Sequence, residues 1–193
     1  MTSYTWAFVG LVVAFSLVRG SFDRWALFTR GPVAYSQKMA VTVWQVGGAV
    51  VGFLLMLAYL FAPHVLAWAT LPLPGWARWS GLGVGIVGLG LLAWSHVALG
   101  RNFSGTIIVR QAHELVTWGP YQYVRHPMYT TLYLFDIAFT LLGANWFVGL
   151  YGFVFLTAVI APRLPQEEAA LRTHFGEQYD HYVAHTGRLL PHL

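Results

Sequence analysis

The sequence contains no cysteine and very few charged residues. The absence of cysteine among its 193 residues excludes disulfide bonds, thiolate nucleophiles and cysteine-ligated metal sites. Charged residues make up only 9% of the chain, whereas a soluble domain has about 25%. Hydrophobic residues account for 57% of the sequence, and the mean hydropathy is +0.57. This composition predicts a multi-pass integral membrane protein, and the length suits a single domain.

Four apolar blocks account for most of the hydrophobic residues: 4–18, 39–61, 79–98 and 129–161. The last block is longer than the roughly 20 residues that one membrane helix needs, and Gly143-Ala144-Asn145 interrupts it. We therefore expect a helical hairpin with arms at 129–142 and 146–161. The predicted fold is an all-α bundle of five transmembrane helices in one domain, with a membrane part (1–98) and a catalytic part (99–193). The glycine-rich third block, which contains Gly81-x-x-x-Gly85, predicts close helix packing.

The first apolar block also has the length of a signal-peptide core. No basic residue precedes it, and no clear small-x-small cleavage site follows it. We therefore expect residues 4–18 to be a retained membrane helix.

The basic residues indicate how the helices are oriented. With five spans, one side of the membrane receives residues 19–38, 99–128 and the tail from 162, which contain ten of the eleven Lys and Arg residues. The other side receives only Arg78. This asymmetry predicts that the side rich in basic residues is cytoplasmic. The formal net charge of +4 is therefore explained by membrane topology, and we expect no nucleic-acid partner.

The most polar stretch of the chain is residues 113–129. It contains two histidines, one arginine, three tyrosines and two prolines. Proline removes a backbone donor and disfavours helix at the residue before it. We expect a turn-rich loop at the cytoplasmic surface, and polar irregular backbone near a membrane usually lines a cavity. This loop is the candidate active site.

A second polar segment follows the last apolar block and lies on the same predicted side. Leu171, Phe175, Tyr179 and Tyr182 recur at i, i+4, i+8 and i+11, the stripe of an amphipathic helix. Pro165 suits the first turn of that helix. Glu168 and Arg172 have the spacing of an i,i+4 ion pair. We expect this helix to lie on the membrane surface or to cover the polar loop.

The loop histidines and Asp136 are two further features that could indicate a functional site. The histidines of the loop lack metal-ligand spacing, so no metal is expected. Asp136 lies within an apolar block, where an ionisable residue is costly and is often functional. Either a functional role or a structural hydrogen bond explains it.

The order and spacing of two motifs give a more specific indication. The first is His113-x-Leu-Val-x-x-Gly-x-Tyr-x-x-x-Arg-His-Pro-x-Tyr129, and the second is Arg163-x-x-x-Glu-Glu-x-x-Leu-x-x-x-Phe-Gly-x-x-Tyr-x-x-Tyr182, followed by Thr186-Gly-Arg-Leu-Leu-Pro191. Over about residues 100–191 the chain resembles the isoprenylcysteine carboxyl methyltransferase family. More broadly, it resembles the membrane methyltransferases that include phospholipid N-methyltransferases.

This resemblance implies that S-adenosylmethionine binds on the cytosolic side, beneath the C-terminal helix. It also implies that a lipophilic, prenylated acceptor enters from the bilayer. By resemblance, the residues that bind the cofactor are His113, Glu114, Leu115, Val116, Gly119, Tyr121, Arg125, His126, Pro127, Met128, Tyr129 and Glu167. The implied catalytic residues are Arg163, Glu167 and Glu168, with Arg163 binding the substrate carboxylate.

The acceptor itself is left open by the sequence. A carboxylate nucleophile needs no general base, whereas an amine or a thiol needs a proton acceptor, for which His126 and Glu168 are candidates. The alternatives are therefore a methyltransferase for a small thiol, an isoprenoid acid or a phospholipid amine. Another alternative is a nicotinamide-dependent membrane reductase, since such reductases have a loosely similar loop and tail. The last alternative is a transporter or assembly factor without a cofactor.

Overall fold

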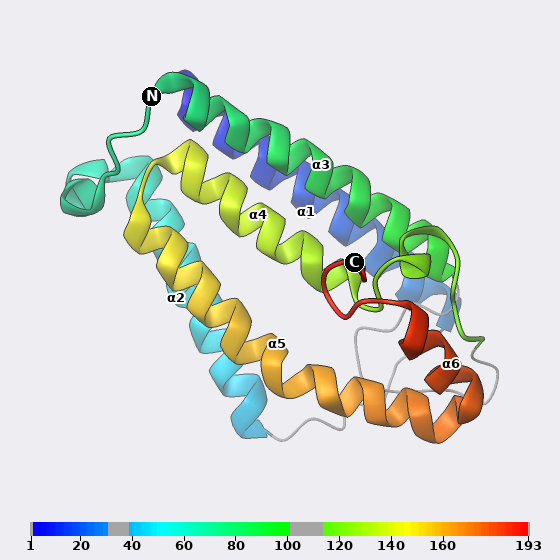
Figure 1. Ribbon diagram of the computed structural model, residues 1–193. Coiled ribbons are helices and arrows are strands. Elements are labelled where there is room, and N and C mark those ends of the chain that lie inside the picture. Colours follow the sequence, from blue (N-terminus) through cyan, green and yellow to red (C-terminus); the bar gives the residue numbers. More distant parts are fainter. Residues whose placement is uncertain (1, 31–38, 101–113, 193) are drawn as a thin grey trace.

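The computed structural model describes residues 2–30, 39–100 and 114–192, and within these ranges the chain is helical (Figure 1). Only isolated β-bridges occur there, and no strand is formed. The all-α expectation is confirmed. In chain order, the elements are α1 (Ser3–Arg30), α2 (Met39–Phe61), the 3₁₀-helix η1 (Pro63–Ala69), α3 (Gly75–Leu99), the 3₁₀-helix η3 (Gly119–Gln122), α4 (Pro127–Gly143), α5 (Trp146–Phe175) and α6 (Glu177–His185).

Four of these helices are long and apolar enough to cross a membrane. The candidate spans are Ser3–Phe22 in α1, Val43–Phe61 in α2, the whole of α3 and α5. α4 is apolar as well, but its 17 residues extend only about 25 Å at 1.5 Å per residue. The membrane bundle is therefore confirmed with four candidate spans among the described residues, and a fifth span through α4 stays a prediction.

The predicted helical hairpin at residues 143–145 is confirmed. Ala144 has a left-handed backbone conformation with φ of 48° and ends α4. Asn145 then begins α5, because its Oδ1 accepts a hydrogen bond from the Val148 N–H at 3.0 Å. Its side-chain amide also donates to the Leu66 carbonyl at 2.9 Å, which ties the turn to η1. The short polar turn thus holds the two arms close together.

The prediction of a separate tail helix beginning near Pro165 is wrong. α5 continues past residue 161, through Pro162 and Pro165, and ends only at Phe175. The reason is visible in its burial, because Ile160, Leu164 and Glu168 are all buried at a spacing of four residues. One packed stripe therefore runs across both prolines and holds the helix together where backbone bonds are lost. Gly176, with φ of 53°, then separates α5 from α6 and divides the predicted amphipathic stripe.

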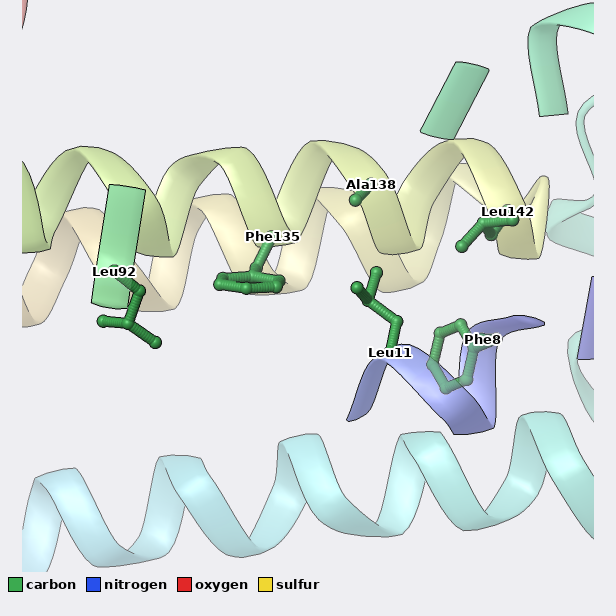
Figure 2. Packing of buried hydrophobic residues seen from close by; sticks show 6 residues of the cluster. All are labelled: Phe8, Leu11, Leu92, Phe135, Ala138 and Leu142. Carbon is green, nitrogen blue, oxygen red and sulfur yellow. The ribbon is translucent and has the colours of Figure 1, made fainter. Parts of the chain in front are cut away.

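The hydrophobic core lies where α1, α3 and α4 meet (Figure 2). It consists of Phe8, Leu11, Leu92, Phe135, Ala138 and Leu142. α2 and α5 lie side by side along the other flank of the bundle, and the Tyr151 hydroxyl donates to the Gly48 carbonyl at 2.5 Å between them (Figure 1). This arrangement leaves the end of α5 free to reach the start of α4.

The glycines of α3 serve packing, as the sequence predicts. A Cβ placed on Gly81 would lie 2.8 Å from the Ala138 carbonyl oxygen, which is backbone of α4. A Cβ on Gly85 would lie 2.3 Å from the Leu11 side chain of α1. A Cβ on Gly83 would meet nothing within 4 Å. α3 therefore contacts α1 and α4 through some of its glycines and not through others.

Replacing Gly81 by alanine should destabilise the bundle, because the new methyl group collides with backbone that cannot move alone. We expect a loss of about 1–3 kcal/mol and a lower melting temperature in detergent. The matched control is Gly83→Ala on the same helix, which has open space and gains up to about 1 kcal/mol of helix propensity. Equal melting temperatures for the two variants would contradict the packing assigned to Gly81.

Candidate active site

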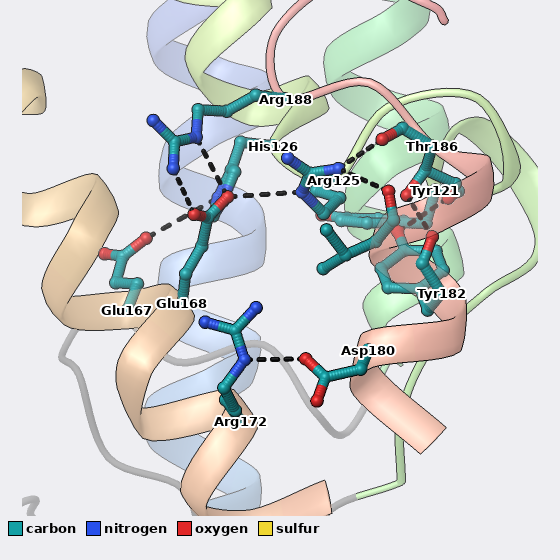
Figure 3. Close-up of polar contacts among 11 residues, drawn as sticks. Tyr121, Arg125, His126, Glu167, Glu168, Arg172, Asp180, Tyr182, Thr186 and Arg188 are labelled. Atoms are coloured by element: carbon teal, nitrogen blue, oxygen red, sulfur yellow. Dashed lines mark hydrogen bonds and ion pairs between the residues drawn. The ribbon is translucent and has the colours of Figure 1, made fainter. Parts of the chain in front are cut away.

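The polar residues of both motifs gather at one end of the bundle. The start of α4, the last turns of α5, α6 and the C-terminal segment meet there (Figures 1 and 3). Arg78 lies toward the opposite end, where it stacks 3.8 Å over the Tyr4 ring and donates to the Leu142 carbonyl. The expectation that the loop and the tail meet on one side is therefore confirmed for the described residues.

Glycine and proline shape the loop that leads into α4. Gly119 has φ of 64°, a left-handed conformation that favours glycine. Pro120 opens η3, where its missing N–H costs nothing. Pro127 likewise occupies the first turn of α4, so this helix begins two residues before the predicted Tyr129. The expected turn-rich loop is confirmed for residues 114–126, with a 3₁₀ turn inside it.

Glu168 is the centre of the densest polar cluster (Figure 3). Its Oε1 accepts hydrogen bonds from Arg125 Nε at 3.2 Å and from Arg188 Nε at 3.0 Å, while Arg188 Nη2 donates to Oε2. His126 Nε2 lies 3.4 Å from Oε1, a contact whose alignment is too poor for a hydrogen bond. The Glu168 side chain is only 11% exposed. Two guanidinium groups therefore hold one nearly buried carboxylate, and Glu168 in turn raises the pKa of Arg188 above its usual value.

Glu167 forms a second, more open cluster beside the first. The Tyr129 hydroxyl donates to Glu167 Oε1 at 2.7 Å. Arg163 Nη2 lies 3.5 Å from the same oxygen, and His126 Nδ1 lies 3.7 Å from Oε2. The side chains of Arg163 and Glu167 are each 21% exposed. This cluster therefore combines an anion, a cation and a phenol, none of which is fully buried.

The C-terminal segment crosses the loop and pairs with its backbone. Val124 and Gly187 form a parallel bridge. The Arg125 N–H donates to the Gly187 carbonyl at 2.8 Å, and the His126 N–H donates to the Arg188 carbonyl at 3.1 Å. Residues far apart in the sequence are thereby joined at the point where α4 begins.

The tyrosines around this loop are neutral hydrogen-bonding groups. Burial, with smaller effects from Tyr182 and Glu167, raises the pKa of Tyr121 far above its usual value. Burial likewise raises the pKa of Tyr179 to about 12. The Tyr182 hydroxyl donates to the Tyr121 carbonyl at 2.6 Å. At neutral pH these phenols carry no charge, so they offer aromatic surface and hydrogen bonds rather than a general base.

The structure brings most of the sequence-predicted site residues together. Tyr121, Arg125, His126, Tyr129, Arg163, Glu167 and Glu168 share this end of the bundle. Pro127 is buried and Met128 half-buried in the first turn of α4. Gly119 lies against α3 instead, because a Cβ there would be 3.1 Å from Ala98. Glu114, Leu115 and Val116 have no regular secondary structure, and His113 lies outside the described residues.

One predicted pairing is wrong, and one important residue was not predicted. Arg172 does not pair with Glu168; its Nε lies 2.6 Å from Asp180 Oδ1 on α6. Glu168 points the other way, toward Arg125 and Arg188, because the stripe to which it belongs is buried. Arg188 was given no role from the sequence, although the spacing of Thr186-Gly-Arg-Leu-Leu-Pro191 was part of the second motif.

Asp136 lies against α5, where a Cβ on Gly152 would be 1.9 Å from its Oδ1.

The known proteins described below, to which this chain is similar, are named as isoprenylcysteine methyltransferases. Residues 81–173 match the model of the isoprenylcysteine carboxyl methyltransferase (ICMT) family. Protein-S-isoprenylcysteine O-methyltransferase B of Arabidopsis thaliana is 32% identical over 110 residues, 56% of each chain. Protein-S-isoprenylcysteine O-methyltransferase of Schizosaccharomyces pombe is 32% identical over 105 residues, 53% of this chain and 44% of that one. The chain thus spans about half the length of these curated relatives.

A solved structure shares the fold. The eukaryotic intramembrane Ras methyltransferase ICMT superposes with a TM-score of 0.63 at 24% sequence identity, over 99% of this chain and 68% of that one. The family-model match includes the Arg125–Tyr129 and Arg163–Glu168 segments that form the two carboxylate clusters. The resemblance inferred from the two motifs is confirmed by the family-model match over residues 81–173 and by the named relatives, and the solved structure shows that the fold is shared.

Proposed function

We propose that this chain is an S-adenosylmethionine-dependent membrane methyltransferase whose acceptor is the carboxylate of a prenylated cysteine. The observation that carries this proposal is the hydrogen bond of 2.7 Å between Tyr129 and Glu167. It joins the loop motif to the tail motif, and Arg163 lies directly beside it. The relatives that share this segment are named as methyltransferases of isoprenylcysteine.

The residues of the Glu167 cluster fit a donor of that chemistry. S-Adenosylmethionine, when bound, supplies a methyl group that its positively charged sulfur already activates. Aromatic rings attract a cation of this kind, and Tyr121 and Tyr129 provide such rings. The amino or ribose hydroxyl groups of S-adenosylmethionine can form hydrogen bonds to the Glu167 carboxylate. The protein then has mainly to orient the two reactants and exclude water. By family resemblance, residues 113–116 complete the donor site.

Arg163 fits the acceptor. Its guanidinium is always charged and has the planar fork that matches a carboxylate. Its side chain is partly exposed, at the point where the apolar part of α5 ends. A prenyl chain can therefore remain in the hydrocarbon while its carboxylate reaches Arg163. A carboxylate acceptor needs no general base, which agrees with a cluster whose tyrosines remain protonated.

The proposed orientation places this site at the cytoplasmic face. It requires α4 to cross the membrane as a fifth span, with the bilayer locally thinned because the helix is short. Arg78, the one basic residue assigned to the other side, lies at the opposite end from Arg125 and Arg163. Arg125 and Arg163, which flank the α4–α5 hairpin, share one end of the bundle, as two crossings by this hairpin require, and this supports an odd number of spans.

The acceptor class can be tested by transfer of labelled methyl groups from S-adenosylmethionine with the purified protein in lipid. The acceptors offered are a prenylated cysteine with a free carboxylate, a small thiol and a phospholipid amine. We expect label in the prenylated cysteine, as an ester that alkali releases. The same prenylated cysteine as its preformed methyl ester is the control and should accept none. Label found only in the thiol or the lipid would contradict the proposed acceptor.

Donor binding should depend on Glu167. Glu167→Ala removes the acceptor of the Tyr129 hydroxyl and the carboxylate proposed to bind the donor. We expect the Kd for S-adenosylmethionine to rise at least tenfold, the effect of losing about 1.4 kcal/mol, as measured by titration calorimetry. Glu177→Ala, at an exposed position in the first turn of α6, is the matched control and should leave the Kd unchanged. An unchanged Kd for Glu167→Ala would remove Glu167 from the donor site.

Arg163 should act on the acceptor instead. Hydrogen bonds to charged groups contribute about 1.5–3 kcal/mol, so Arg163→Gln should raise the KM for prenylcysteine roughly tenfold to a hundredfold. The Kd for S-adenosylmethionine should change less than about threefold. Arg172→Gln removes an exposed guanidinium from the same helix and should alter neither value. An equal loss of donor binding in Arg163→Gln would contradict this division of roles.

A further inference from the structure

The last residues of the chain form a closed connection to the loop before α4. We call residues 186–190 the clasp. Its backbone carbonyls accept the N–H groups of Arg125 and His126, and the Gly187 N–H donates to the Tyr123 carbonyl at 3.2 Å. The Thr130 hydroxyl donates to the Leu189 carbonyl at 2.6 Å, already within α4. The clasp therefore fixes the backbone on both sides of His126.

Side chains close the clasp from the opposite direction (Figure 3). Arg125 Nη1 donates to the carbonyl oxygens of Val183 and Thr186, and Arg125 Nε donates to Glu168. Arg188, from within the clasp, reaches the same carboxylate. Among the ion pairs of the described residues, Glu168 is thus the only acid that pairs with an arginine of the loop and with an arginine of the clasp.

The charges explain why this arrangement is stable only when complete. Without the Glu168 carboxylate, the nearly buried Arg125 guanidinium would lie close to a second guanidinium, that of Arg188, with no anion between them, and like charges repel. Arg125 is 11% exposed, so leaving it unpaired is costly. Arg188 is 52% exposed, so it can be changed with little loss of packing. The clasp can therefore be opened at Arg188 without removing a core side chain.

We propose that the ion pair between Arg188 and Glu168 holds the clasp closed and thereby presets the donor-binding loop. Arg188 and Glu168 are then positioning residues rather than catalytic ones. They act through the backbone of Arg125 and His126 on Tyr129 and Glu167. This inference rests on the proposed function only for its effect on donor binding; the closure of the clasp is independent of the reaction.

The test uses Arg188→Gln in the full-length protein in lipid, with two matched variants. Arg188→Lys keeps the charge and should retain much of the wild-type behaviour. Arg172→Gln breaks the exposed pair between α5 and Asp180 of α6 and removes no contact of the clasp. The first readout is hydrogen exchange at the Arg125 and His126 amides, which donate to the clasp. We expect exchange at least tenfold faster in Arg188→Gln, partial rescue in Arg188→Lys and no change in Arg172→Gln.

The second readout is steady-state methyl transfer. Arg188→Gln should raise the KM for S-adenosylmethionine about tenfold, with kcat within twofold of wild type, because the reacting groups are present but the loop is not preset. A lower kcat with an unchanged KM would overturn the positioning role. Unchanged hydrogen exchange in Arg188→Gln, or equally fast exchange in Arg172→Gln, would contradict the proposal that the Arg188–Glu168 ion pair holds the clasp closed. If the wild-type protein transfers no methyl group, the proposed function is wrong. The hydrogen-exchange measurement still tests whether the ion pair holds the clasp closed.

Discussion

The arrangement of this site depends on one carboxylate that binds two arginines. Glu168 is held by Arg125 from the loop and by Arg188 from the C-terminal segment. Arg125 lies 43 positions before Glu168 in the sequence, and Arg188 lies 20 positions after it. Because Glu168 and Arg125 are nearly buried and costly to leave unpaired, the three segments stabilise one another in this arrangement. The start of α4 and the end of α5 are positioned by that constraint.

Neighbouring glutamates on α5 consequently face different environments. Successive residues on a helix point about 100° apart, so Glu167 faces Tyr129 while Glu168 faces the two arginines. Glu168 has both oxygens engaged, whereas Glu167 remains 21% exposed beside Arg163. A sequence motif with two adjacent acids thus separates into one residue suited to hold the site together and one suited to meet a ligand.

The sequence was most informative where periodicity and composition decide the structure. Apolar length predicted the membrane helices, Gly143-Ala144-Asn145 predicted the hairpin, and the basic residues placed loop and tail together. It failed where tertiary contacts override a local signal. Pro165 reads as a helix start, yet the buried stripe through Ile160, Leu164 and Glu168 keeps α5 continuous. Arg188 had no predictable role, because it lies in the non-helical segment after α6, 20 residues from its partner on α5, and no periodicity links the two.

The central claim is that this site binds a methyl donor rather than a nicotinamide. The partly exposed Glu167 carboxylate and the aromatic rings of Tyr121 and Tyr129 beside it favour a ligand that carries a positively charged sulfur. Titration calorimetry of the wild-type protein in lipid, with S-adenosylmethionine and with reduced nicotinamide adenine dinucleotide phosphate in parallel, compares the two directly. We predict saturable binding of S-adenosylmethionine and none of the nicotinamide. Binding of the nicotinamide alone would contradict the account.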